Sequence, residues 1–172
     1  MNESMSGIIF LGTARKKGNT HQVAKLLAEE TGFEFRDLSE YTVGPYDYEY
    51  NNSEDDFIAL AEEMVKYDKI VLASPVYWYT MSAQLKAFID RFSDLVRVRK
   101  DLGRALEDKK MYVLSCGSGD FCPEHFTEPF KYSANYLNMN FQNHLHTWGE
   151  KDGRPISEEI VERVKEYALK IK

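Results

Sequence analysis

The chain has 172 residues and a net charge of -6, with 43% hydrophobic and 29% charged residues. This is an ordinary composition for a soluble globule, and the length suits a single domain spanning residues 1–172. The acidic balance argues against nucleic-acid binding, and no apolar run approaches the roughly 20 residues that a transmembrane helix needs. The first residues also lack the basic and apolar regions of a signal peptide. We therefore expect a cytoplasmic protein without a nucleic-acid or membrane partner.

Short apolar runs alternate with helical patterns along the chain. The expected strands cover residues 7–12, 33–38, 69–73, 111–116 and 141–148, the last of them polar enough for an edge strand. The expected helices cover residues 20–31, 82–92, 126–137 and 157–171, and a further helix is expected after Ser53, with its apolar face at residues 57–65. Strands that alternate with helices in this way predict an α/β fold, a doubly wound parallel sheet with helices on both faces.

Local signals predict where several of these elements begin and end. Asn19 followed by Gln22, and Ser53 followed by Asp56, resemble capping boxes at the start of two helices. Pro75 is expected to stop sheet pairing after the third strand, since proline has no backbone N–H to donate.

The first of three unusual loops, Gly12–Thr20, joins the first strand to the first helix. A helix N-terminus after a buried strand attracts anions. The loop adds side-chain hydrogen-bond donors, a glycine that lets the backbone approach the anion, and an arginine that can donate two parallel hydrogen bonds. These residues are Thr13, Asn19, Thr20, Gly18 and Arg15. The sequence predicts a phosphate site here; the alternative that fits the same residues is a capped turn with surface cations.

The first loop lacks the patterns of several common phosphate sites. It has no Gly-Lys-Ser/Thr ending, which excludes a nucleotide-triphosphatase loop, and no GxGxxG dinucleotide fingerprint. The strand before it ends in Leu11-Gly12 rather than in an acidic pair, so magnesium would find no ligands, which argues against a phosphoacceptor receiver domain.

The second loop, Ser74–Met81, and the third loop, Cys116–Asp120, follow the third and fourth strands. In doubly wound sheets ligands bind at the carboxyl ends of such strands. Proline and aromatic residues in the second loop suit a flat polycyclic ligand, and glycines in the third let backbone approach it. The alternative for the second loop is a plug of aromatic side chains in the core.

Together the three loops resemble those of the flavodoxin-like, NADPH-dependent FMN reductases, a family that includes iron–sulfur flavoproteins and related quinone reductases. The motifs are GTARKKGNT at the first strand end and SPVYWYTMSAQLKAFIDR after the third strand. The resemblance covers nearly the whole chain and implies the strand order 2-1-3-4-5. No cysteine occurs in residues 40–53, where cluster-bearing members carry their motif, so a cluster there is not expected.

What the resemblance implies is FMN as cofactor. Its phosphate would be held by Thr13, Arg15, Gly18, Asn19 and Thr20. Its ring and ribityl chain would be lined by Pro75, Val76, Tyr77 and Trp78, and its pyrimidine edge approached by Gly117, Ser118 and Asp120.

The expected activity is hydride transfer from NAD(P)H through FMN to a quinone, a flavin or a similar small acceptor. The cofactor carries this chemistry, so no catalytic side chain is assigned. The alternative is a flavodoxin-type electron carrier without direct NAD(P)H reactivity. The resemblance and the many aromatic residues also predict a homodimer or a homotetramer.

Other polar groups have plainer expected roles. Cys116 is expected to be a small buried cysteine rather than a thiol nucleophile paired with His125. His144 and His146 share one strand face, but without an evident third ligand no metal site is predicted. The tyrosine-rich loop 40–53 either covers a flavin or is an ordered surface loop.

Overall fold

The computed structural model describes residues 7–149 and 154–172. Five strands form one parallel sheet in the order β2-β1-β3-β4-β5, which confirms the predicted fold. The strands are β1 (Gly7–Leu11), β2 (Glu34–Asp37), β3 (Lys69–Pro75), β4 (Lys110–Gly117) and β5 (Asn140–Trp148). The order steps outward from β1 in both directions, so the carboxyl ends of β1 and β3 meet at the switch point.

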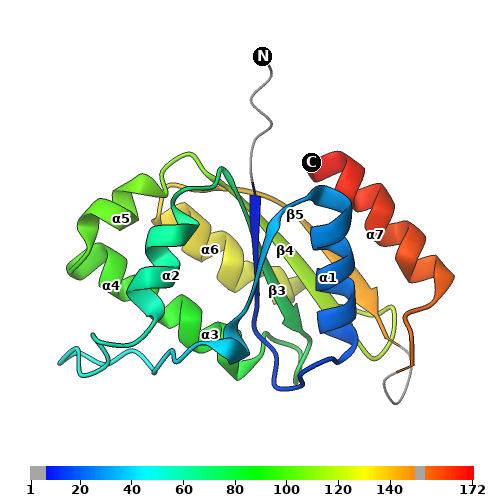
Figure 1. The fold of residues 1–172 in the computed structure, drawn as a ribbon, viewed down its shortest axis with the longest axis horizontal. Helices are drawn as coiled ribbons and strands as arrows, with labels where there is room; N and C mark the ends of the chain where they lie inside the picture. Colours follow the sequence, from blue (N-terminus) through cyan, green and yellow to red (C-terminus); the bar gives the residue numbers. More distant parts are fainter. Residues whose placement is uncertain (1–6, 150–153) are drawn as a thin grey trace.

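Helices cover both faces of this sheet (Figure 1). They are α1 (Asn19–Thr31), α2 (Phe57–Met64), α3 (Ala83–Asp90), α4 (Phe92–Arg97), α5 (Lys100–Ala105), α6 (Glu128–Tyr136) and α7 (Glu158–Ile171). Short 3-10 turns, η1 (Leu38–Glu40) and η2 (Glu124–Thr127), follow β2 and precede α6. Within the described ranges, no helix has the length and apolar character to cross a membrane.

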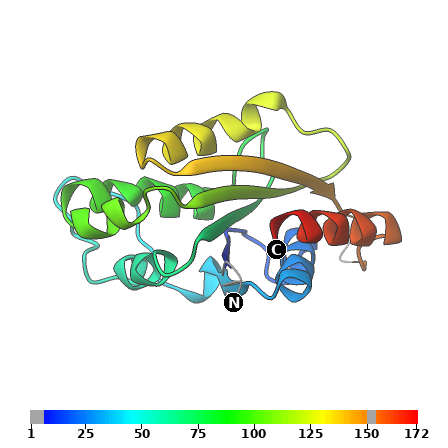
Figure 2. The same cartoon turned by 90° about the horizontal axis from the view of Figure 1, so that it is seen from above.

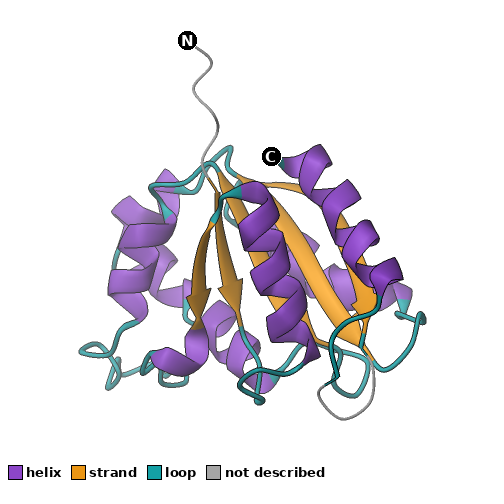
Figure 3. Ribbon diagram, turned by 45° about the vertical axis from the view of Figure 1, so that its right-hand side comes forward, coloured by secondary structure: helices purple, strands orange, loops and turns teal. Residues whose placement is uncertain are grey.

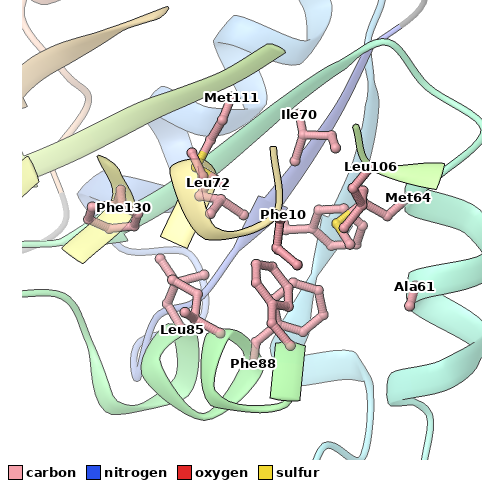
Figure 4. Packing of buried hydrophobic residues seen from close by; sticks show 14 of the residues in the cluster. Phe10, Ala61, Met64, Ile70, Leu72, Leu85, Phe88, Leu106, Met111 and Phe130 are labelled. Atoms are coloured by element: carbon pink, nitrogen blue, oxygen red, sulfur yellow. The ribbon is translucent and has the colours of Figure 1, made fainter. Parts of the chain in front are cut away.

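Alternating side chains of the strands feed two separate cores, because successive residues of a strand point to opposite faces. Ile9 of β1 packs in the core beneath α1 and α7, whereas Phe10 packs beneath the helices of the opposite face. The two layers of helices are seen from above in Figure 2. In the larger core the rings of Phe10 and Phe88 stack with centroids 5.1 Å apart (Figure 4).

Both predicted capping boxes are wrong. The cap of α1 is Gly18, and Asn19 is already the first helical residue; the helix ends at Gly32, which has a left-handed φ of 73°. The helix α2 begins one residue after Asp56, and it is Asp55 whose carboxylate accepts the Phe57 N–H, at 3.0 Å. The helix therefore begins after the pair Asp55-Asp56 and not directly after the predicted cap, Ser53.

Strand β3 ends at Pro75, as predicted, and its pairing with β4 includes this last residue. Pro75 belongs to β3 in register with Cys116, and the next residue, Val76, donates its N–H to the Cys116 carbonyl at 2.9 Å. Donors alternate between the two sides of a strand, so the missing N–H of Pro75 faces the β1 side. On that side the last bond runs from the Gly12 N–H to the Ala73 carbonyl at 2.9 Å, and Pro75 has no donor to extend the ladder.

The chain between α3 and β4 contains two short helices that the sequence pattern did not predict. Helices α4 and α5 have six residues each and follow the expected helix 82–92, which ends earlier, at Asp90. Elements this short carry little periodicity. The basic cluster at residues 97–100 lies at the junction of α4 and α5.

Candidate active site

The three unusual loops meet at the carboxyl edge of the sheet, below the strand tips in Figure 3. Ser82, the N-cap of α3, joins two of them: its hydroxyl donates to the Gly12 carbonyl at 2.7 Å and its N–H donates to the Ser74 hydroxyl at 2.9 Å. A Cβ on Gly12 would lie 2.6 Å from the Leu85 backbone nitrogen, so only glycine permits this approach. The first and second loops are thus held together through α3.

The first loop presents the N-terminal end of α1 without a side-chain cap. Its N-cap, Gly18, is extended and forms no side-chain cap bond. Arg15 is exposed, whereas the hydroxyl-bearing Thr13 and Thr20 are buried beside the backbone. A helix N-terminus without a side-chain cap, flanked by exposed cations, is the arrangement that binds phosphate groups.

Asn19 lies at the same helix end, but its side chain is directed toward the end of β5. A Cβ on Gly149 would come within 1.8 Å of the Asn19 amide nitrogen, so the amide packs flat on that glycine. The Gly149 N–H in turn donates to the Gly117 carbonyl at 3.2 Å. Asn19 therefore connects the first loop to the third loop as well as bordering the predicted phosphate site.

The second loop turns back on itself at its aromatic residues. Tyr77 and Thr80 exchange two backbone hydrogen bonds, of 2.9 and 3.1 Å, and the two residues between them have positive φ angles, 46° for Trp78 and 69° for Tyr79. Such a turn normally selects glycine or asparagine. Here it projects a 92% exposed Trp78 into solvent, which rules out the alternative of an aromatic core plug.

A hollow of about 310 Å³ lies between the second and third loops. We call it the aromatic hollow. Five of the predicted ring-contacting residues line it: Val76, Trp78, Gly117, Ser118 and Asp120. Four residues that were not predicted also line it: Tyr79, Gly119, Phe121 and Pro123.

Two predicted ring contacts are placed differently. Pro75 is buried within β3, and Tyr77 is 41% exposed at the base of the turn; the described lining of the aromatic hollow contains neither of them. The missed aromatic residues Tyr79 and Phe121 stand directly beside predicted ones in the sequence. Their position next to a predicted contact residue in the same loop is the sequence signal that could have identified them.

The third loop is anchored from β5. His146 donates from Nε2 to the Gly119 carbonyl at 3.0 Å, since a carbonyl can only accept. Its other nitrogen, Nδ1, lies 2.7 Å from the Ser115 hydroxyl, which also lies 2.7 Å from Nε2 of His144. Burial is the main cause of a lowered pKa for both histidines, to about 4 for His144, so both rings are neutral near pH 7.

The prediction that Cys116 is a small buried cysteine agrees with the structure. Cys116 is buried, and burial raises the pKa of its thiol, which makes it unreactive. Lys86 and Asp90 form an exposed ion pair on α3. The tyrosines of loop 40–53 pack on each other, with the rings of Tyr46 and Tyr48 5.3 Å apart.

Comparison with known proteins places this geometry in a family. The family model for NADPH-dependent FMN reductases matches residues 5–149. The chain belongs to this family. It is 25% identical over 157 residues to YwqN of Bacillus subtilis (strain 168), a protein named as an NAD(P)H-dependent FMN-containing oxidoreductase, with 84% of this chain and 86% of that protein covered.

Solved structures show the same fold. The Trp repressor binding protein from Bacillus subtilis aligns with a TM-score of 0.72 and 22% identity, over 92% of this chain and 95% of its own. An NADPH-quinone reductase from P. pentosaceus aligns with a TM-score of 0.67 and 18% identity, over 95% and 97%. The predicted family, the flavodoxin-like fold and FMN as the cofactor of the family are thereby confirmed.

The residues at the carboxyl edge fit FMN. The N-terminus of α1 with its exposed cations suits a monophosphate, and the aromatic hollow offers stacking surfaces and glycine backbone to a flat ring. Both parts lie at the same edge of the sheet, where ligands of doubly wound folds bind.

Proposed function

We propose that this member of the FMN reductase family oxidises NAD(P)H and reduces a quinone or a similar planar acceptor. The aromatic hollow carries the proposal, because it is open to solvent and bordered by exposed flat side chains that a ring-shaped acceptor can contact. The names of the quinone reductase with the same fold and of the FMN-containing relative agree with this choice.

In this proposal the first loop holds the phosphate and the other two loops hold the ring. The phosphate would be bound by Thr13, Arg15, Gly18, Asn19 and Thr20, and the ring and ribityl chain would be lined by Pro75, Val76, Tyr77, Trp78, Gly117, Ser118 and Asp120. Bound FMN supplies the chemistry, accepting hydride from the nicotinamide and passing electrons to the acceptor.

The chain itself contributes binding, orientation and electrostatics. The backbone of the third loop, which His146 fixes through Gly119, would direct its N–H groups toward the polar edge of the ring. Trp78 and Tyr79 would cover one side of the hollow and limit the access of water. No described side chain is needed as a general acid or base.

The test of this function is direct reduction by nicotinamide. Purified, FMN-loaded protein should lose its yellow colour on anaerobic addition of NADPH or NADH, and should then regain it when a benzoquinone is added. Failure to bleach with either nicotinamide, in protein that does bind FMN, would favour the electron-carrier alternative. Bleaching without reoxidation by any quinone, flavin or azo compound would contradict the proposed acceptor.

Arg15→Ala is expected to weaken FMN binding by about 10-fold, the effect of losing one hydrogen bond to a charged group. Because Arg15 is exposed, the melting temperature of the apoprotein should not change. The measurement is the quenching of FMN fluorescence on titration with protein. Lys16→Ala, next in the same loop, is the matched control for the loss of a surface charge. Equal FMN affinity of the Arg15 variant and the parent chain would show that Arg15 does not bind the phosphate.

We also propose that the chain forms a homodimer or homotetramer in the cytoplasm. The exposed side chains around the aromatic hollow, Trp78, Tyr79 and Phe121, form an apolar patch that a second copy could cover. Light scattering of the purified protein would test the oligomeric state, and a monomeric mass at micromolar concentration would contradict it.

A further inference from the structure

A polar cluster lies between β4, β5 and the segment that follows the third loop. It contains Cys122, His144 and His146, and one potential ligand atom from each residue lies within 4.8 Å of the other two. The sequence did not indicate this cluster because Cys122 is distant along the chain from the two histidines. The path of the chain after β4 brings the thiol back over β5.

The strands fix the positions of the two imidazoles. His144 and His146 are two apart on β5 and therefore share one face of the sheet. Ser115, which pairs with His146 in the β4–β5 register, lies between the rings. The ring of Phe126 stacks on His144 with centroids 5.6 Å apart and holds its plane.

The hydrogen bonds of His146 select the form that a metal ligand needs. Since Nε2–H donates to the Gly119 carbonyl, Nδ1 carries the lone pair that points into the cluster. A histidine that donates its second nitrogen to a backbone carbonyl is the usual arrangement around protein-bound metals, where the partner fixes the tautomer and the ring orientation. In the metal-free protein, the Ser115 hydroxyl donates to this lone pair and accepts from Nε2–H of His144.

An open approach leads to the cluster. All three residues line a hollow of about 710 Å³, which we call the histidine hollow. Carboxylates and cations both line it: Asp120, Glu124, Glu128, Lys131 and Arg163. Lys131 is paired with Glu128 at 2.9 Å, and Arg163 donates to the His146 carbonyl at 3.0 Å. The lining thus carries three carboxylates against two cations, an excess of negative charge that attracts a cation.

We propose that Cys122, His144 and His146 bind a divalent cation of borderline softness, such as Zn²⁺, with its fourth position open to the histidine hollow. Two imidazoles and one thiolate match the ligands that Zn²⁺ takes in proteins, whereas Mg²⁺ and Ca²⁺ prefer oxygen. Binding displaces the Ser115 hydroxyl from between the rings, shifts the His144 proton to Nδ1 and releases the thiol proton of Cys122. This site does not depend on the proposed acceptor or on FMN.

The test uses the full-length, FMN-loaded protein after dialysis against a chelator. Zn²⁺ binding is measured by titration calorimetry, and Co²⁺ serves as the spectroscopic probe in difference spectra. We expect one Zn²⁺ per chain, a higher melting temperature with Zn²⁺, and a thiolate-to-cobalt charge-transfer band with the visible bands of four-coordinate Co²⁺. Absence of Zn²⁺ binding, or Co²⁺ spectra without the thiolate band, would overturn the proposal.

Variants locate the ion. Because even changes beyond the direct ligands cost about 10- to 100-fold in metal affinity, Cys122→Ser and His144→Asn should each weaken Zn²⁺ binding by at least about 10-fold. Cys122→Ser should also abolish the charge-transfer band. The matched controls are Cys116→Ser, at the buried cysteine outside the cluster, and His125→Asn, at an exposed histidine nearby. Loss of binding in either control, or unchanged binding in both test variants, would place the ion elsewhere.

Discussion

Arg91→Met is expected to lower the free energy of unfolding by about 3–5 kcal/mol, the effect of removing one partner from a buried ion pair. The Arg91 side chain is only 2% exposed and pairs with Asp55 and Asp94, themselves 8% and 7% exposed. Its guanidinium also donates to the carbonyls of Gly44 and Asn52, each at 3.2 Å. Methionine fills similar volume but leaves two buried carboxylates without a cation. Urea denaturation followed by circular dichroism measures the loss.

The matched control is Lys86→Met on α3, the helix that directly precedes Arg91. Lys86 and Asp90 are about half exposed, so this pair should contribute no more than about 0.5 kcal/mol. A second variant that also carries Asp55→Asn and Asp94→Asn should recover part of the stability lost in Arg91→Met, because the uncompensated charges are gone. If Arg91→Met and Lys86→Met cost the same, burial of the Arg91 network contributes nothing to folding.

The Arg91 network also explains how the tyrosine-rich loop is ordered. Gly44 and Asn52 belong to loop 40–53, and Asp55 accepts the Gly44 N–H at 2.8 Å, so the loop is tied to α3 and α4 at both of its ends. Tyr48, at the tip, is 77% exposed and lies under the guanidinium of Arg97. In Arg91→Met we expect faster chymotrypsin cleavage at the tyrosines of this loop than in the parent chain.

The sheet could be predicted from the sequence because each inner strand is buried on both faces. Such strands read as continuous apolar runs, and the pattern held for β1, β3 and β4. The long amphipathic helix α7 was also predicted from its periodic apolar residues, over residues 157–171. Features that depend on a partner distant in the sequence could not be predicted. The role of Pro75 depends on where β1 ends, and the role of Arg91 depends on a loop far from it along the chain.

The candidate site, like the fold, could be predicted from the sequence only in part. Loops that carry glycine and aromatic residues at strand ends were predicted, because the strand order decides where they meet. The contribution of Cys122 to a cluster with His144 depends on the path of an irregular segment, for which the sequence has no periodic signal. The backbone strain of the second loop was hidden for a similar reason, since φ angles follow from the turn rather than from the residue types.

That strain leads to the second large expected effect: replacing Trp78-Tyr79 with Asn-Gly should raise the free energy of unfolding by about 2 kcal/mol. Trp78 and Tyr79 have positive φ angles of 46° and 69°, which side chains of this size seldom adopt, and both are mostly exposed, so little packing is lost. Asparagine and glycine suit a two-residue turn of this kind. Thermal and urea unfolding of the apoprotein measure the gain.

The same replacement should weaken FMN binding by about 10-fold, because one to two ring contacts are lost from the aromatic hollow. Phe121→Ser is the matched control: it removes an exposed aromatic from that hollow at a residue without positive φ, and should weaken binding without a gain in stability. The two aromatic residues in this strained, exposed turn therefore lower the free energy of unfolding, which points to a role in binding. If the Asn-Gly variant were more stable and bound FMN as tightly, the turn would serve another contact, such as the surface of a second subunit.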